Sequence, residues 1–132
     1  MLKPENRLKK TRDFNLVMKR GRWANAEFFD LKYLELAKNR DFFPKKIEPN
    51  DFEKQLKIAF AVGLKLSKSA VKRNRLRRQM REVVRLLVKD DKIKNGYYLL
   101  FVAKKGSLDL NYADISREIH LLLSRARTLK ES

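Results

Sequence analysis

A run of basic residues between positions 65 and 85 is the part of the sequence whose residue types and spacing best suit a chemical role. It reads KLSKSAVKRNRLRRQMREVVR, with nine Lys or Arg residues and one acid, Glu82. Wound as an α-helix, it gives an apolar face of Leu76, Met80, Val83, Val84 and Leu87, and an opposite face of Asn74, Arg77, Arg78, Arg81 and Arg85. Guanidinium groups match phosphate oxygens, so the pattern predicts a helix that binds nucleic acid.

The charge order along this helix opposes its own stability. Lys72 and Arg73 fall in the first turns, where the helix dipole disfavours cations by roughly 0.3–1 kcal/mol each. An ordinary solvated helix face interleaves Glu with Lys, whereas this face has almost no acids. We therefore interpret it as a functional surface. Arg73 projects towards the apolar side, so it either contacts a ligand at the helix end or supports the fold.

A second group of residues, in the first third of the chain, is aromatic or apolar. These side chains either pack in the core or leave one face open, where unpaired bases could stack on them. Both interpretations are open for Phe14, Met18, Phe28, Phe29 and Tyr33.

No set of residues suits catalysis by the chain itself. His120 is the only histidine and there is no cysteine, so neither a zinc site nor a nucleophile–base pair is expected. The acids form no evident pair, and the four glycines form no phosphate-binding loop. The sequence therefore predicts a binder of RNA or DNA without its own active site.

The composition agrees with a polyanionic partner. The chain has 132 residues and a net charge of +17, and a compact state with that charge repels itself. One domain over residues 1–132 is expected. We find no signal peptide and no apolar run long enough for a bilayer, so we expect a cytoplasmic protein with no membrane partner.

The elements that must position these residues follow from periodicity and turn signals. A helix capped by Thr11 should end at Gly21. Strands are expected over 22–26, 27–37, 55–64 and 97–103, with a long exposed loop over 38–54. Ser67 or Ser69 should cap the basic helix, which runs to about Lys89, and a last helix should begin near Asn111. This order predicts an α+β or α/β sandwich with the basic helix connecting two strands of one sheet.

Residues 70–78, AVKRNRLRR, followed by Arg81 and Glu82, resemble the RNR motif of the bacterial ribonuclease P protein family. Arg7-Leu8, Asp13-Phe14, Val17 and Gly21 are similar to the family's N-terminal helix segment. Residues 60–66 and 97–104 resemble the strands on either side of the motif. The resemblance covers nearly the whole chain except 38–54, which is a possible insertion.

This resemblance implies an α+β fold of order αβββαβα, with a mostly antiparallel central sheet and the basic helix in a left-handed βαβ crossover. It implies a protein subunit of ribonuclease P, the endonuclease that removes the 5′ leader from precursor tRNA. The catalytic groups would lie in the catalytic RNA subunit, which would also hold most of the magnesium. The implied partners are ribonuclease P RNA and precursor tRNA, with no DNA expected.

The resemblance also implies two sets of site residues. The RNA-binding set on the basic helix is Lys72, Arg73, Asn74, Arg75, Arg77, Arg78, Arg81 and Arg85. The set expected at the leader cleft is Phe14, Met18, Phe29 and Lys65. Two positions depart from the family pattern, since Met18 replaces a second cleft aromatic and Lys68 replaces a glycine before the motif.

Two other functions remain open at this point. A general or ribosome-associated RNA-binding protein would bind RNA without a processing role. A DNA-binding regulator would read the major groove with the basic helix, but no preceding helix and tight turn and no dimerisation heptad are evident.

Overall fold

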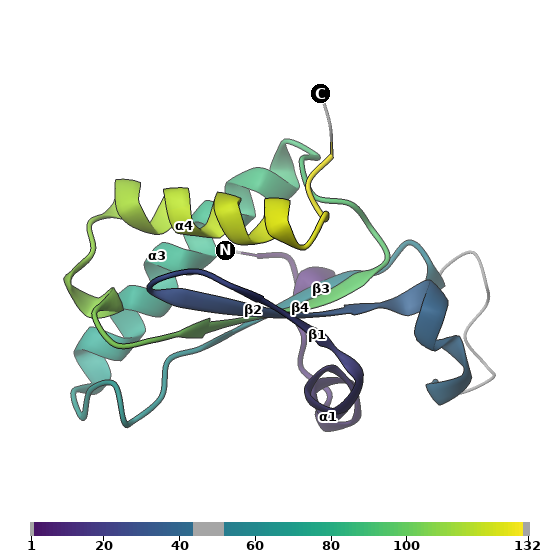
Figure 1. Cartoon of the computed structure of the whole chain (residues 1–132), viewed down its shortest axis with the longest axis horizontal. Coiled ribbons are helices and arrows are strands. Elements are labelled where there is room, and N and C mark those ends of the chain that lie inside the picture. The colour runs from purple at the N-terminus through teal and green to yellow at the C-terminus, as the bar shows by residue number, and fades with distance from the viewer. Residues whose placement is uncertain (1, 44–51, 131–132) are drawn as a thin grey trace.

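A four-stranded sheet of order β1-β2-β4-β3 is the frame of the computed structural model, which describes residues 2–43 and 52–130 (Figure 1). The strands are β1 (Arg22–Asn25), β2 (Phe29–Glu35), β3 (Leu56–Ala61) and β4 (Tyr97–Ala103). β1 pairs with β2 and β2 with β4 in antiparallel fashion, whereas β3 and β4 are parallel. β4 is thus a central strand although it is the last in the sequence.

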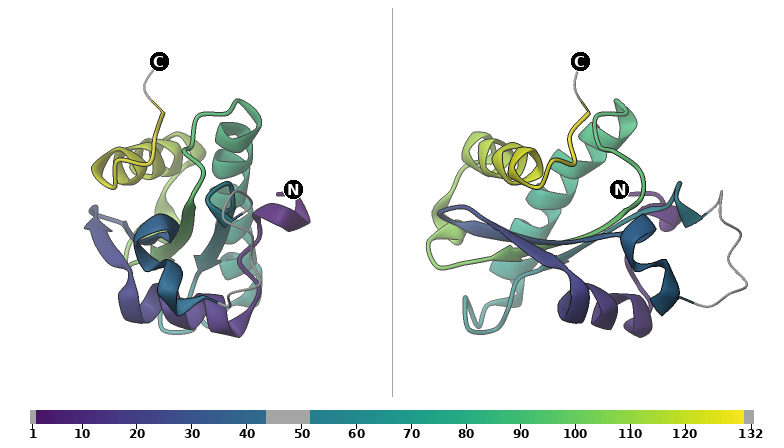
Figure 2. Two further views of the ribbon diagram at one scale, coloured as in Figure 1. Left: turned by 90° about the vertical axis from the view of Figure 1, so that its right-hand side faces the viewer. Right: turned by 45° about the vertical axis from the view of Figure 1, so that its right-hand side comes forward.

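Helices cover both faces of this sheet. α3 (Ala70–Lys89) and α4 (Tyr112–Arg125) pack together on one face, and α1 (Thr11–Arg20) lies on the other (Figures 1 and 2). Short 3-10 helices complete the described chain: η1 (Pro4–Asn6), η2 (Leu36–Phe42) and η3 (Ser107–Asp109). The α+β class is confirmed, as is the position of the basic helix between two strands of one sheet. The left-handedness of that crossover stays a prediction of the resemblance.

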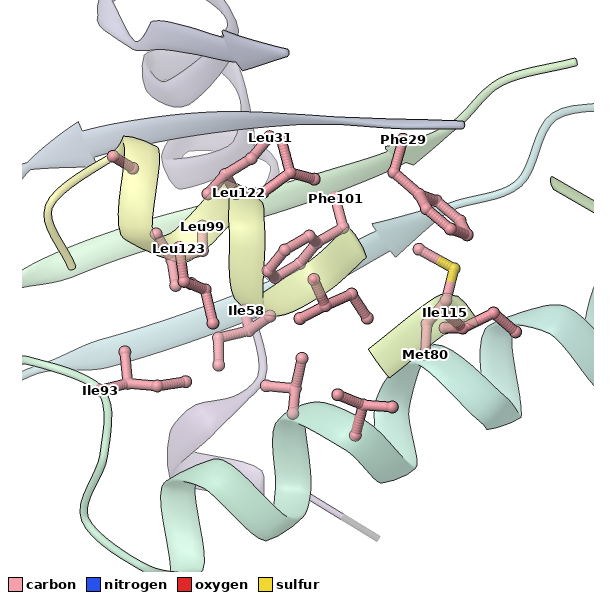
Figure 3. Close-up of a cluster of buried hydrophobic side chains, with 14 of the residues drawn as sticks. Phe29, Leu31, Ile58, Met80, Ile93, Leu99, Phe101, Ile115, Leu122 and Leu123 are labelled. Atoms are coloured by element: carbon pink, nitrogen blue, oxygen red, sulfur yellow. The ribbon is translucent and has the colours of Figure 1, made fainter. Parts of the chain in front are cut away.

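The main core lies between the sheet and the pair α3 and α4 (Figure 3). Alternate strand residues point into it, including Leu31 and Phe101, and meet Met80 of α3 and Ile119 of α4. The predicted apolar face of α3 packs there, together with Ile115, Ile119, Leu122 and Leu123 of α4. This packing fixes the rotation of α3 about its axis, so its basic face must point away from the sheet.

A second, smaller core lies on the α1 face and corrects the prediction for 38–54. Residues 36–42 form η2 and are not an open loop, and Phe43 and Phe52 are buried with ring centroids 4.7 Å apart. They pack with Val17 and Tyr98, because α1 alone leaves part of this sheet face uncovered. The rest of the possible insertion, 44–51, lies outside the described residues.

The helix starts agree with the expected capping at two of three positions. Ser69, not Ser67, caps α3, since its Oγ accepts from the Lys72 amide at 3.3 Å. Asn111 caps α4, since its Oδ1 accepts from the Asp114 amide at 2.9 Å. The cap predicted at Thr11 is wrong: Thr11 is already the first helical residue, and Lys10 holds the extended cap position without a side-chain hydrogen bond.

The N-terminal segment covers the outer edge of β3. The Leu8 amide donates to the Ile58 carbonyl at 3.0 Å, and the Asn6 side-chain amide donates to the Leu56 carbonyl at 2.9 Å. These bonds satisfy backbone groups that an uncovered edge strand would present to other chains. Across residues 2–43 and 52–130, no helix is both long and apolar enough to cross a bilayer.

Candidate nucleic-acid interface

The basic face of α3 points outward as its periodicity predicts. Lys72, Asn74, Arg75 and Arg78 are exposed, and Arg77 and Arg81 are partly exposed. The opposite side of the helix is anchored by its buried stripe in the main core. A rigid element therefore presents the cations, which favours binding a partner at low conformational cost.

Arg73 supports the fold. Its guanidinium donates to the Ser67 carbonyl at 2.9 Å and so ties the turn before α3 to the first turn of the helix. The Ser69 amide donates to the Ser67 Oγ at 3.1 Å in the same turn. Of the two roles left open for Arg73, this hydrogen bond supports the one in which the side chain buttresses the start of the basic helix, and contact with a ligand stays a prediction.

Arg85 differs from the other arginines of the predicted RNA-binding set because it has a protein partner. Its Nε and NH2 donate to the two carboxylate oxygens of Glu82 at 2.9 and 2.6 Å. These hydrogen bonds hold the pKa of Glu82 below its ordinary value. Within the described parts of the chain, no other arginine of α3 forms an ion pair.

Arg77 carries a polar atom without a partner. Its Nε is buried and makes no hydrogen bond to any described residue, while the residue as a whole is partly exposed. A buried donor left unpaired carries a desolvation cost that nothing nearby offsets. Arg77 is therefore the arginine of this face whose environment is least explained by folding alone.

A cavity of about 470 Å³ adjoins the start of α3. Lys72 and Arg75 line it from the helix, and Lys105 lines it from the segment between β4 and η3. Lys105 was absent from the sequence-based set. The signal available for it was the Lys104-Lys105 pair directly after a buried strand, but only the fold shows that this strand end lies beside α3.

The predicted leader-binding set divides on burial. Phe14 and Met18 lie one turn apart on α1 with 36% and 43% of their surface exposed, so both remain available to a ligand. Phe29 is fully buried in the main core on the opposite face of the sheet, and its place in the leader cleft is wrong. Lys65 is exposed in the segment between β3 and α3.

The position of α1 on the sheet is held by a buried lysine. Lys32 of β2 is only 8% exposed, and its Nζ donates to the Met18 carbonyl near the end of α1. The same ammonium group lies 4.9 Å from the centre of the Trp23 ring. Met18 and Phe14 are therefore carried by a helix fixed to the sheet through a buried, charge-assisted contact.

Side chains that commonly bind metal ions are not clustered in the described parts of the chain. No group of three or more His, Asp or Glu side chains within 2–43 and 52–130 could hold a metal ion. His120 is exposed on α4, with its Nδ1 2.7 Å from the Ser116 carbonyl of the preceding turn.

Comparison with known proteins agrees with the motif. The family model described as Ribonuclease P matches residues 2–127. The ribonuclease P protein component of a Synechococcus strain is 33% identical over 129 residues, covering 98% of this chain and 87% of the relative. That of Clostridioides difficile is 36% identical over 121 residues, covering 89% of each chain.

Solved structures show the same fold. The ribonuclease P protein from Staphylococcus aureus superimposes with a TM-score of 0.72 at 21% identity, covering 100% of this chain and 97% of that one. The protein from Thermotoga maritima gives 0.68 at 21% identity, covering 90% and 96%. With the RNR motif on an outward helix, and with matches along nearly its whole length, the chain belongs to the ribonuclease P protein family.

Proposed function

We propose that the outward face of α3 binds the catalytic RNA of ribonuclease P, and that the α1 side of the sheet holds the 5′ leader of precursor tRNA. Through its family, the chain is a protein subunit of ribonuclease P, the endonuclease of tRNA 5′ maturation. The observation that carries the RNA-binding half is the row of α3 arginines that form no ion pair with any described residue. Phosphate oxygens would supply the missing partners.

On this proposal the residues of α3 act by different means. Arg78 and Arg81 would contact phosphates directly, and Arg77 would do so through the terminal nitrogens of its guanidinium, since its Nε is buried. Arg73 would act indirectly, by fixing the turn that precedes the helix. Arg85 would have to give up or share its ion pair with Glu82 in order to bind a phosphate. Its contribution to RNA affinity should therefore be smaller than that of Arg78 or Arg81.

The leader half of the proposal rests on Phe14 and Met18. Two exposed apolar side chains on a basic helix are suited to unpaired bases, since stacking is tolerant of sequence. Met18 offers apolar contact without a ring, so Phe14 should carry most of the stacking. Magnesium would be supplied through the RNA, and we assign no step of the reaction to this chain.

Reconstitution tests this function. The protein alone should not cleave precursor tRNA, and adding cognate catalytic RNA with magnesium at low salt should give 5′ processing that the protein stimulates. A leader-length series then reports on α1, because stimulation should grow with leader length until the α1 side is filled.

Two outcomes would reject the proposal. One is cleavage of precursor tRNA by RNA-free protein, and the other is a cleavage rate of the catalytic RNA that does not change when the protein is added. RNA binding without a leader-dependent effect would instead favour a general or ribosome-associated RNA-binding protein. Competition between precursor tRNA and duplex DNA distinguishes these two RNA-binding functions from a DNA-binding regulator, which would prefer the duplex DNA.

A further inference from the structure

A second basic region lies away from the outward face of α3 and away from Phe14 and Met18. It is a cavity of about 810 Å³ where the end of α4 meets η2 and the adjoining ends of β1, β2 and β4. Figure 1 shows η2 and the C-terminal end of α4 towards one end of the sheet, and the start of α3 towards the other. Six of the lining residues are cations: Arg20, Arg22, Lys38, Lys94, Arg125 and Arg127.

The fold explains only some of these cations. Arg20 and Arg125 end α1 and α4, where a helix dipole favours positive charge, and Arg125 also donates to the Asn25 carbonyl. Lys38 pairs with Glu35 at 3.2 Å. Arg22, Lys94 and Arg127 make no ion pair with any residue in 2–43 or 52–130.

Arg127 occupies a backbone conformation that favours glycine. Its φ is +58°, and its amide donates to the Ser124 carbonyl while the next amide, of Thr128, donates to the Leu123 carbonyl. This is the helix-ending arrangement in which glycine usually follows the cap residue. A long basic side chain is kept here at a cost in backbone strain, beside a cavity that it lines.

Two aromatic rings share the cavity with the cations. Tyr33 of β2 and Tyr97 of β4 point to the α4 side of the sheet and are partly exposed. Arg22 lies opposite Tyr33 in the β1–β2 pairing, and Glu35 lies opposite Tyr97 in the β2–β4 pairing. The Tyr97 hydroxyl donates to Glu35 at 3.3 Å, which orients the ring.

Cations beside open aromatic rings are the combination that single-stranded nucleic acid recognises: the cations take the phosphates and the rings stack on bases. A free phosphate would use the cations but would leave both tyrosines without a role. We infer that this cavity is a second binding site for single-stranded RNA, separate from the outward face of α3 and from Phe14 and Met18, with Arg22, Lys94 and Arg127 on phosphates and Tyr33 and Tyr97 on bases. The chain would therefore engage RNA at opposite ends of its sheet.

Photocrosslinking identifies the peptides that contact RNA. It can therefore locate this site even when the α3 face also contributes to the total RNA affinity. A ten-nucleotide oligouridylate containing 4-thiouridine is bound to the full-length protein at low salt, irradiated, and the attached peptides are identified by mass spectrometry. We expect crosslinks on the peptides carrying Tyr33 or Tyr97. They should persist in Arg78→Gln/Arg81→Gln, which disables the α3 face, so that loss of that face and loss of this site are told apart.

Arg127→Gly supplies the most specific test. Glycine relieves the backbone strain, so the variant should unfold at the same temperature as the parent or higher, while its crosslinks at Tyr33 and Tyr97 fall about fivefold or more. The slope of log affinity for oligouridylate against log salt concentration should also become shallower by about 0.7, the value for one phosphate contact on a single strand. Arg22→Gln should lower the crosslinks and the salt slope in the same way as Arg127→Gly.

The matched control is Arg117→Gln, which also removes one charge. Arg117 lies on the exposed side of α4 in a pair with Asp114 at 3.2 Å, and its crosslinking pattern should equal that of the parent. The inference is overturned if no crosslink maps to either tyrosine peptide, if Arg127→Gly crosslinks like the parent, or if Arg117→Gln lowers the signal equally. Competition by inorganic phosphate without any base crosslink would reveal an anion site only, which also rejects it.

Discussion

At the scale of single residues, the arginines of α3 differ in what the protein already does with them. Arg73 and Arg85 have protein partners, whereas Arg78 is exposed without one and Arg77 has an unpaired buried nitrogen. A count of basic residues in the motif therefore overstates the number of groups free to bind RNA.

Replacing Arg78 or Arg81 by alanine should weaken binding to the catalytic RNA. Each variant should also reduce the slope of log affinity against log salt by about 0.7–0.9, the value for one phosphate contact. Filter binding across a salt series measures both quantities. Arg117→Ala is the control for charge alone, and an unchanged slope in the α3 variants would place those residues outside the interface.

Phe14→Ala should selectively weaken the binding of substrates that carry a leader. One lost base stack is worth about 1–3 kcal/mol, so affinity for leader-bearing tRNA should fall by about tenfold while leaderless tRNA binds as before. Because Phe14 is exposed, its removal should hardly change the unfolding temperature. Val17→Ala, on the buried side of the same helix, is the contrasting variant and should cost about 1–3 kcal/mol of stability. Equal loss for both substrates in Phe14→Ala would indicate damage to the fold.

At the scale of elements, β4 links the two cores because its residues alternate between them. Tyr98 lies on the α1 side, is 2% exposed, and donates its hydroxyl to Gln55 Oε1 at 2.6 Å. Burial raises the pKa of Tyr98 well above its ordinary value, and the nearby Asp13 carboxylate acts in the same direction. The folded protein therefore holds the phenol proton more tightly than the unfolded chain does.

This difference predicts an alkaline loss of stability. Above the unfolded tyrosine pKa of about 10, the native state binds more protons than the unfolded state, so the free energy of unfolding should fall by about 1.4 kcal/mol per pH unit through Tyr98. Urea midpoints at pH 9, 10 and 11 measure the fall. The lysines also titrate there, so the informative quantity is the difference from Tyr98→Phe, which should show a shallower decline. Parallel curves would contradict the assignment.

Periodicity predicted the existence and order of the elements, and it predicted which face of α3 is buried, because a helix with one apolar stripe turns that stripe towards the core. It could not place Phe29. β2 has apolar residues on both faces, and only the arrangement of helices decides which face each core covers. Phe43 and Phe52 were missed for a similar reason: their segment has no period, and they are buried because α1 leaves part of the sheet open.

The cavity at the end of α4 also lay beyond sequence reasoning. Its cations come from α1, β1, η2, the segment before β4 and the end of α4, which are widely spaced along the chain. None of these positions stands out alone in a sequence with 33 basic residues.

At the scale of the whole molecule, most of the charge of +17 lies on the surface, while the described interior is mainly apolar and holds the charged residues Asp13 and Lys32. Self-repulsion of this size destabilises the folded state, and screening or anion binding should relieve it.

The unfolding temperature should therefore rise with added salt, and rise further with sulfate than with chloride at equal ionic strength. A gain of about 1 kcal/mol corresponds to about 3–6 °C for a chain of this length. Scanning calorimetry in the two salts measures the effect, and sucrose serves as an uncharged stabiliser for comparison. A flat response to both salts would mean that repulsion does not limit stability.

The central place of β4 also constrains how the protein can be made. β2 and β3 are both bonded to a strand that leaves the ribosome after them, so before β4 is synthesised the two strands cannot be joined in one sheet. Such non-local pairing delays folding. A nascent chain rich in lysine and arginine thus lies next to ribosomal RNA before its sheet is complete. Its RNA-binding surfaces would then become rigid together, once β4 is in place. The nascent chain would be attracted to RNA only through its charge, whereas the folded protein would recognise RNA through fixed surfaces.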